Sequence, residues 1–226
     1  MKTILITGRT DLVTSKLLEQ LSGRFSVVLT SSDKDREEIN ARVYNVEPGT
    51  HAFEQLFWAY DFYAVWYFSP YCDGGVSIDD FSNTRVIYKF CRDNFVKKLI
   101  VVSSTLLSEE ERGVEEGVLL SSDDMETGVV ILRLPLVLVE GNQNTALGRV
   151  FQGMKRNVRT LPVPNMKNES FDFFPMRDAF SLMKKISLAG RENGVYNLPG
   201  EHVISRGQMQ REISAAGCRT KLQSEG

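Results

Sequence analysis

The chain has 226 residues, with 27 Lys and Arg, 29 Asp and Glu, and a formal charge of −2 at pH 7. A hydrophobic content of 42% and a charged content of 25% are typical of a globular protein and exclude a disordered chain. Duplex nucleic-acid binders usually carry a strongly basic balance, so no nucleic-acid partner is expected. The length suits one domain with a small appended lobe.

Three widely spaced cysteines, Cys72, Cys91 and Cys218, form neither a disulfide framework nor a zinc pattern. We therefore expect reduced thiols and no metal site. No basic segment precedes an apolar one at the N-terminus, which argues against a signal peptide. The longest apolar stretches, such as residues 134–139, are too short to span a bilayer. These features predict a cytoplasmic protein with no membrane partner.

Apolar, β-branched runs alternate with segments of helical spacing in the first 134 residues. The predicted strands are 3–7, 26–30, 42–46, 63–68, 99–102 and 129–134. The predicted helices are 13–21, 51–60, 80–94 and 109–125, with a charged, solvated loop or short helix at 33–42. This alternation predicts an α/β fold, a Rossmann-like doubly wound parallel sheet that binds ligands at the carboxyl ends of its strands.

The pattern loosens after Gly141. We predict a helix at 147–155, an extended segment at 161–164, a helix at 176–189, a strand at 194–198 and a helix at 207–216. This part looks too small to fold alone. The predicted division is therefore a doubly wound domain at 1–140 and a small C-terminal lobe at 141–226 packed on it.

A dinucleotide-binding turn needs three glycines after the first strand. The turn at 7–14 reads TGRTDLVT and keeps only Gly8, with Asp11 and Thr14 where the second and third glycines belong. Taken alone, this turn fits a plain strand-to-helix connection better than a cofactor site.

Several later segments, in order, carry a more specific pattern. These are LIVVSST at 99–105, VILRLP at 130–135, Val137 and Gly141 in the following turn, 171–178 with an aspartate that starts a helix, and VYNL with a glycine at 195–200. The ordered set resembles the extended short-chain dehydrogenase/reductases, the NAD-dependent epimerase/dehydratase family. The resemblance covers nearly the whole chain, and it implies that 1–140 is an NAD(P)-binding domain and that the lobe at 141–226 lies on the substrate side.

The resemblance implies a set of residues that contact the cofactor. They are Gly8, Thr10, Asp11, Leu12, Val13, Ser31, Ser32, Asn45, Val46, Phe68, Ser69, Ser103 and Pro135. Ser31 and Ser32 stand where an acid would bridge the ribose hydroxyls, and Lys34 and Arg36 lie nearby, so NADP is favoured over NAD. A plain polar loop explains 31–36 equally well. Asp11 would repel a pyrophosphate, so we expect weak dinucleotide binding or none.

The family's proton relay is absent. Thr105 matches its catalytic Ser/Thr, but no Tyr lies between Tyr88 and Tyr196 and no Lys between Lys98 and Lys155. The Tyr-x-x-x-Lys pair therefore has no equivalent, and the acidic segment at 108–127 cannot lower a tyrosine pKa as a lysine does.

Other candidate groups have simpler interpretations. Tyr67 and Tyr71 suit packing, His51 and His202 lack an evident partner, and the glutamates at 109–116 suit a solvated helix face.

Three functions stay open at this stage. The first is an NAD(P)-dependent oxidoreductase or epimerase acting on a small polar or nucleotide-sugar substrate. The second is a degenerate binding or regulatory protein that kept the fold and lost hydride chemistry, and the third is an enzyme using the old pocket without a cofactor. All three imply a small-molecule ligand. The family commonly dimerises through the helices near Asp80 and Ser108, so a homodimer, or a partner chain that completes the site, is a further expectation.

Overall fold

The computed structural model describes residues 1–70, 72, 82–122, 126–139, 160–163, 170–190, 193–200, 202–205, 211 and 221–224. Its centre is a seven-stranded sheet. The strands are β1 (Lys2–Gly8), β2 (Phe25–Thr30), β3 (Arg42–Tyr44), β4 (Phe62–Phe68), β5 (Lys98–Ser104), β6 (Gly128–Leu134) and β10 (Gly194–Asn197). Their spatial order is β10-β6-β5-β4-β1-β2-β3, and each neighbouring pair is parallel. The predicted doubly wound parallel sheet is confirmed.

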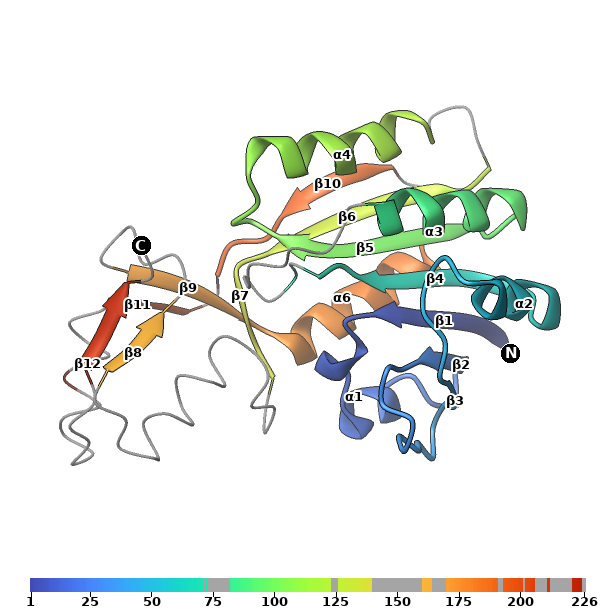
Figure 1. The fold of residues 1–226 in the computed structure, drawn as a ribbon, viewed down its shortest axis with the longest axis horizontal. Helices are drawn as coiled ribbons and strands as arrows, with labels where there is room; N and C mark the ends of the chain where they lie inside the picture. Colours follow the sequence, from blue (N-terminus) through green and yellow to red (C-terminus); the bar gives the residue numbers. More distant parts are fainter. Residues whose placement is uncertain are drawn as a thin grey trace.

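The strand order reverses between β1 and β4, and sheets of this kind bind ligands at such a switch point. In Figure 1 the carboxyl ends of β1, β4 and β5 point toward the small strands at the left of the view. Any ligand of this sheet would therefore lie between the central strands and those small strands.

The central strands are apolar throughout because both faces of the sheet are covered. Residues such as Ile4, Trp66 and Ile100 pack in one layer with α1 (Ser15–Glu19) and α6 (Met176–Leu188). Alternate residues such as Leu5 and Val65 pack in the other with α2 (His51–Ala59), α3 (Ser82–Asp93) and α4 (Glu109–Leu120). Figure 1 shows α3 and α4 on one side of the sheet and α1 and α6 on the other.

Several predicted boundaries differ from the structure. The predicted helix at 13–21 is reduced to the five-residue α1, and a short 3-10 turn, Thr10–Leu12, precedes it. Val13 between them is extended, and the Thr14 side chain makes no capping hydrogen bond, so the first turns are not joined. The segment at 33–42 is a loop, and the third strand ends at Tyr44 instead of Val46. Asp80 and Met125, at predicted helix ends, lie outside the described residues.

Part of the predicted C-terminal lobe completes the central sheet. β10 pairs with β6, and α6 packs on the sheet through Phe180, whose ring centroid lies 5.4 Å from that of Trp66. The Trp66 indole N–H donates to Ser187 Oγ at 2.8 Å. These contacts join residues on both sides of the predicted boundary at residue 140. The division into two domains at that residue stays a prediction.

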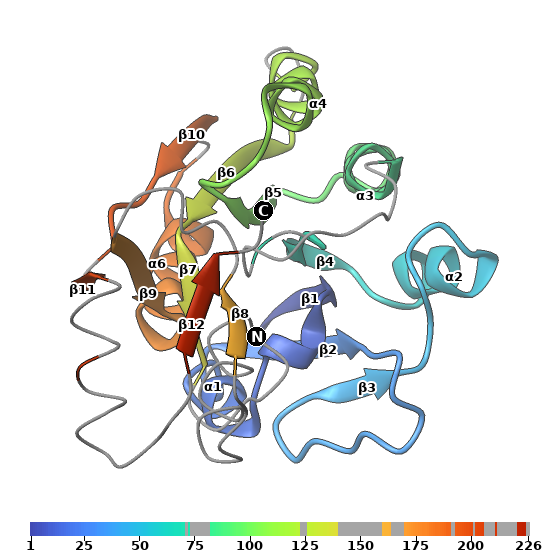
Figure 2. The same ribbon diagram turned by 60° about the vertical axis from the view of Figure 1, so that its left-hand side comes forward.

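The other strands after residue 135 form two small sheets beyond the carboxyl ends of the central strands (Figures 1 and 2). One contains β7 (Leu136–Leu138), β9 (Ser170–Pro175) and β11 (His202–Ser205), and the other pairs β8 (Thr160–Val163) with β12 (Lys221–Ser224). The predicted helix at 147–155 lies outside the described residues, as does 207–216 apart from Arg211.

Candidate functional site

The loop after β1 starts at Gly8, whose φ of +90° lies in the left-handed region that favours glycine. A Cβ at this position would lie 2.0 Å from the Phe68 carbonyl oxygen. The N–H of Arg9 donates to that same oxygen at 2.9 Å. The close approach of β4 therefore requires glycine here, independently of any ligand.

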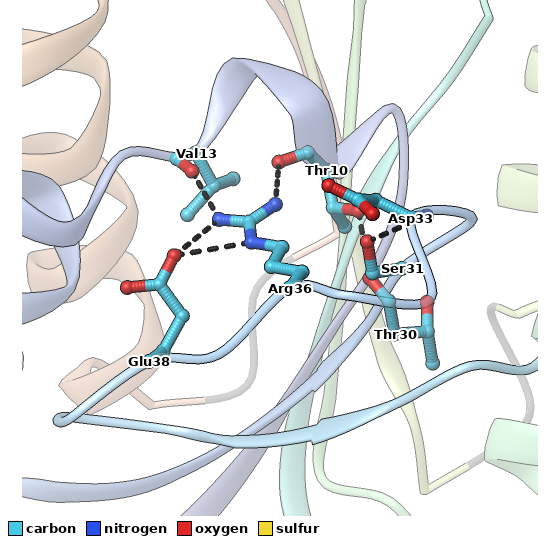
Figure 3. A network of polar contacts seen from close by, with 7 residues as sticks. All are labelled: Thr10, Val13, Thr30, Ser31, Asp33, Arg36 and Glu38. Atoms are coloured by element: carbon cyan, nitrogen blue, oxygen red, sulfur yellow. Dashed lines mark hydrogen bonds and ion pairs between the residues drawn. The ribbon is translucent and has the colours of Figure 1, made fainter.

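The inner side of this loop binds a side chain of the protein itself. Figure 3 shows the Arg36 guanidinium between the loop after β1 and the loop after β2. Its Nη1 donates to the carbonyl of Thr10 at 2.6 Å, and its Nη2 donates to the carbonyl of Val13. The guanidinium also pairs with Glu38 at 2.8 Å, and the two side chains are only 13% and 6% exposed. The expectation that 33–42 is uniformly solvated is therefore wrong at Arg36 and Glu38.

The remaining loop residues are also held by the protein. Asp11 accepts two hydrogen bonds from Arg9, at 2.9 and 3.0 Å, so its charge already has a counterion. Leu12 and Val13 are buried in the core. The Thr10 hydroxyl donates to the Thr30 carbonyl at 2.7 Å and ties the loop to β2.

The segment after β2 is ordered by hydrogen bonds to the backbone. The Ser31 N–H donates to the Tyr44 carbonyl, and the Asn45 side-chain amide donates to the Ser31 carbonyl at 2.8 Å. The Ser31 hydroxyl accepts from the Asp33 N–H at 3.1 Å. Ser32 is exposed, whereas Val46 packs against the layer that contains α2. The side-chain amide of Asn45, one of the expected cofactor contacts, thus has a partner within the chain.

These contacts do not fit a dinucleotide at the loop after β1. Pyrophosphate is bound by backbone N–H donors at the start of a helix. Here two loop carbonyls, those of Thr10 and Val13, accept from a guanidinium, and α1 spans only five residues. The chemistry of this loop is that of a cation receptor, and the cation is Arg36.

A second group of expected site residues lies at the ends of β4, β5 and β6. Phe68 is fully buried and stacks on Phe180 with centroids 6.0 Å apart, so its ring fills the layer with α6. Pro135 is buried between β6 and β7. Thr105 is half-buried, and its N–H donates to the Leu134 carbonyl at 2.8 Å.

Three buried polar atoms in this region have no hydrogen-bond partner among the described residues. They are Ser69 Oγ, Ser103 Oγ and Arg112 Nε. Ser69 is 3% exposed and Ser103 is fully buried. An unsatisfied buried polar group costs about 1–3 kcal/mol. Sequence reasoning placed Ser69 and Ser103 at the site but missed Arg112, the one cation in an acidic helix, which donates from Nη2 to the Thr105 carbonyl at 2.8 Å.

The acidic helix α4 is not wholly a solvated face. Glu115 is 2% exposed and accepts from Arg133 Nε of β6 at 3.1 Å. Glu116, which is half-exposed, contacts the same guanidinium at 3.3 Å. The expectation of a solvated charge run is wrong at Glu115. The signal was available in the sequence, because an arginine inside a strand buried on both faces needs a counterion.

The other candidate side chains that the structure describes pack in the core or contact neighbours on their own helix. Tyr67 is buried in the layer with α2, and the exposed His51 lies 3.4 Å from Glu54. Tyr71 and the His202 side chain lie outside the described residues. Within the described ranges, no three metal-ligating side chains come together, and no helix is long and apolar enough to cross a membrane.

The chain is similar to known proteins in its fold but not in its sequence. No family model matches the chain, and no curated protein matches it. The UDP-glucose 4-epimerase of Thermotoga maritima, solved with UDP-glucose, superimposes with a TM-score of 0.75 at 14% identity, over 99% of this chain and 85% of that one. MoeE5, solved with UDP-glucuronic acid and NAD, gives 0.76 at 17% identity, over 100% and 86%. The UDP-glucuronic acid 4-epimerase of Bacillus cereus gives 0.73 at 14% identity, over 98% and 85%.

The chain therefore has the fold of the NAD-dependent epimerases and dehydratases, along its whole length. The resemblance drawn from the sequence is confirmed at the level of fold. Identities of 13–17% leave the chemistry to be argued from the side chains.

Proposed function

We propose that this chain is a divergent member of the NAD-dependent epimerase/dehydratase family that binds a small molecule and has lost dinucleotide-dependent hydride transfer. The observation that carries the proposal is the Arg36 guanidinium held by the carbonyls of Thr10 and Val13. At these two positions the loop presents carbonyl acceptors, whereas a pyrophosphate needs N–H donors. Asp11 is a smaller obstacle than its charge alone predicts, because Arg9 neutralises it.

The proton relay supports the same proposal. Hydride transfer in this family needs a Tyr and Lys pair, and the helix that would carry it, α4, has neither residue. General acid–base help of that kind is worth about 10²–10⁴ in rate. Thr105 keeps the proposed role of orienting a bound ligand. Dimerisation through α3 and α4, and completion by a partner chain, stay predictions.

The competing function is an NAD(P)-dependent oxidoreductase or epimerase acting on a nucleotide sugar. It is favoured by the compared structures, some of which contain NAD and a UDP-sugar. Under that function NADP should bind at least as well as NAD, because no acid occupies Ser31 or Ser32 and the exposed Lys34 lies close by.

Calorimetric titration with NADP and NAD separates the two functions. We expect dissociation constants weaker than about 0.1 mM for both. The combined change Asp11→Gly and Thr14→Gly should strengthen binding, because it removes the acid and a Cβ from the loop. Asp35→Ala, which removes an exposed acid from the loop after β2, is the matched control and should change little. Low-micromolar NADP binding, with turnover that Thr105→Ala abolishes, would establish the oxidoreductase instead.

A further inference from the structure

Ser69 and Ser103 lie side by side at the carboxyl ends of β4 and β5. Phe68 and Val102 are in register, and the Ser69 N–H donates to the Val102 carbonyl at 2.9 Å, so the pairing continues past the strand end. Adjacent strands are about 4.8 Å apart. Side chains alternate between the two faces of a sheet. Because Tyr67 and Val101 face the layer with α3 and α4, the two serines face that layer too.

Arg112 belongs to α4, which packs on the side of the sheet that the two serines face. Arg133, in register with Ser103, pairs with Glu115 of α4, so this part of α4 covers the end of β5. Arg112 precedes Glu115 by three residues and therefore shares its helix face. Its Nη2 donates to the Thr105 carbonyl, two residues beyond Ser103.

The charge of this group is unbalanced. Arg133 has two carboxylates, Glu115 and Glu116. Among the described residues, Arg112 forms no ion pair; its hydrogen bond goes to a neutral carbonyl, and its buried Nε has no partner. A guanidinium with a spare N–H, on the same side of the sheet as two unsatisfied hydroxyls, is donor chemistry suited to an oxyanion. Thr105 and Arg112 are half-buried and Leu106 is 40% exposed, so the outer edge of the group reaches solvent.

We infer that Ser69, Ser103 and Arg112 form an anion-binding subsite for the carboxylate or phosphate group of a small ligand, beside Thr105. The hydroxyls form its buried floor and the guanidinium supplies the countercharge. The subsite lies on the α3 and α4 side of β4 and β5, whereas Arg36 contacts the carbonyls of Thr10 and Val13 in the loop after β1. This inference rests on the proposed small-molecule site and adds that the ligand carries an anionic group. It does not depend on whether a dinucleotide binds.

The test uses two simple probes, inorganic phosphate and acetate, titrated into the full chain at up to about 10 mM and followed by calorimetry and by the unfolding temperature. We expect at least one probe to bind. Arg112→Met and the double change Ser69→Ala with Ser103→Ala should each weaken binding by about tenfold or more. Phosphate binding alone would assign a phosphate ligand, and acetate binding alone a carboxylate ligand.

Ser104→Ala is the matched control. Ser104 is as buried as its neighbour but faces the opposite layer, and its hydroxyl accepts from the Leu106 N–H at 3.1 Å. This control should keep the affinity and lower the unfolding temperature. The double serine variant should instead keep or raise that temperature, by about 2–4 °C, because it removes unsatisfied groups.

Failure of both probes to bind, or equal affinity in all variants, would overturn the subsite. Loss of binding in Ser104→Ala to the same extent would also overturn it. Tight NADP binding would refute the proposed function and leave the subsite standing, so the two failures are distinguishable.

Discussion

Replacing Gly8 by alanine tests whether this glycine serves the fold or only a ligand. At φ +90° an alanine pays for left-handed backbone with about 1–2 kcal/mol. Its Cβ would meet the Phe68 carbonyl oxygen at 2.0 Å, and overpacking of this kind adds about 1–3 kcal/mol. The free energy of unfolding should therefore fall by about 2–5 kcal/mol. For a chain of this size, each kcal/mol corresponds to about 2–4 °C in the unfolding temperature.

Two other glycines separate the contributions. Gly23 has a φ of +80° with no atom within 4 Å of its Cβ position, so Gly23→Ala should show only the backbone cost of about 1–2 kcal/mol. Gly113 lies in α4 with open space around it, and Gly113→Ala should stabilise the protein by about 0.5–1 kcal/mol. Urea unfolding without any ligand gives all three values.

The reasoning fails if Gly8→Ala is no more destabilising than Gly23→Ala. Equal values would mean that the β1 loop moves away from β4 at little cost. Gly8 would then be explained better by a ligand that needs close approach of the backbone.

Two further predictions concern buried polar pairs. Glu115→Gln should lower the free energy of unfolding by about 3–5 kcal/mol because Arg133 would lose its buried countercharge, whereas Glu116→Gln, at a half-exposed position, should cost less than about 1 kcal/mol; similar losses in urea unfolding would refute this difference. Ser187→Ala should cost about 1–3 kcal/mol by leaving the buried Trp66 indole N–H unsatisfied, and Ser187→Thr, which keeps a hydroxyl, should recover part of the loss if this bond is the cause.

The central sheet could be predicted from the sequence because its signals are local. Continuous apolar runs indicated strands covered on both faces, and all seven central strands appear at or near the predicted residues. The helices α2 and α6 also followed from their periodic apolar residues. Short elements were predicted less well, since α1 and β3 depend on contacts with their neighbours more than on their own sequence.

The candidate site was predicted only in part. The expected positions Gly8, Ser69, Ser103 and Thr105 do lie at the carboxyl edge of the sheet, where chain topology alone places them. Their use as ligand contacts stays a prediction. The role of Arg36 could not be seen in the sequence, because a cation in a charged loop looks the same whether it is solvated or buried.

The sequence by itself determined the layered architecture, since periodic apolar residues leave few ways to bury two faces of a sheet. Only the tertiary structure decided which charged groups meet. Arg36 lies 26 residues from the Thr10 carbonyl it binds, and Arg133 lies 18 residues from Glu115. Such pairs form only where the fold brings two side chains or backbone groups to within about 3 Å of each other. The number of residues between them in the sequence does not say whether they will meet. The sequence therefore carries the resemblance to an NAD-binding fold, whereas the folded chain places its own guanidinium against the loop that such folds use for phosphate.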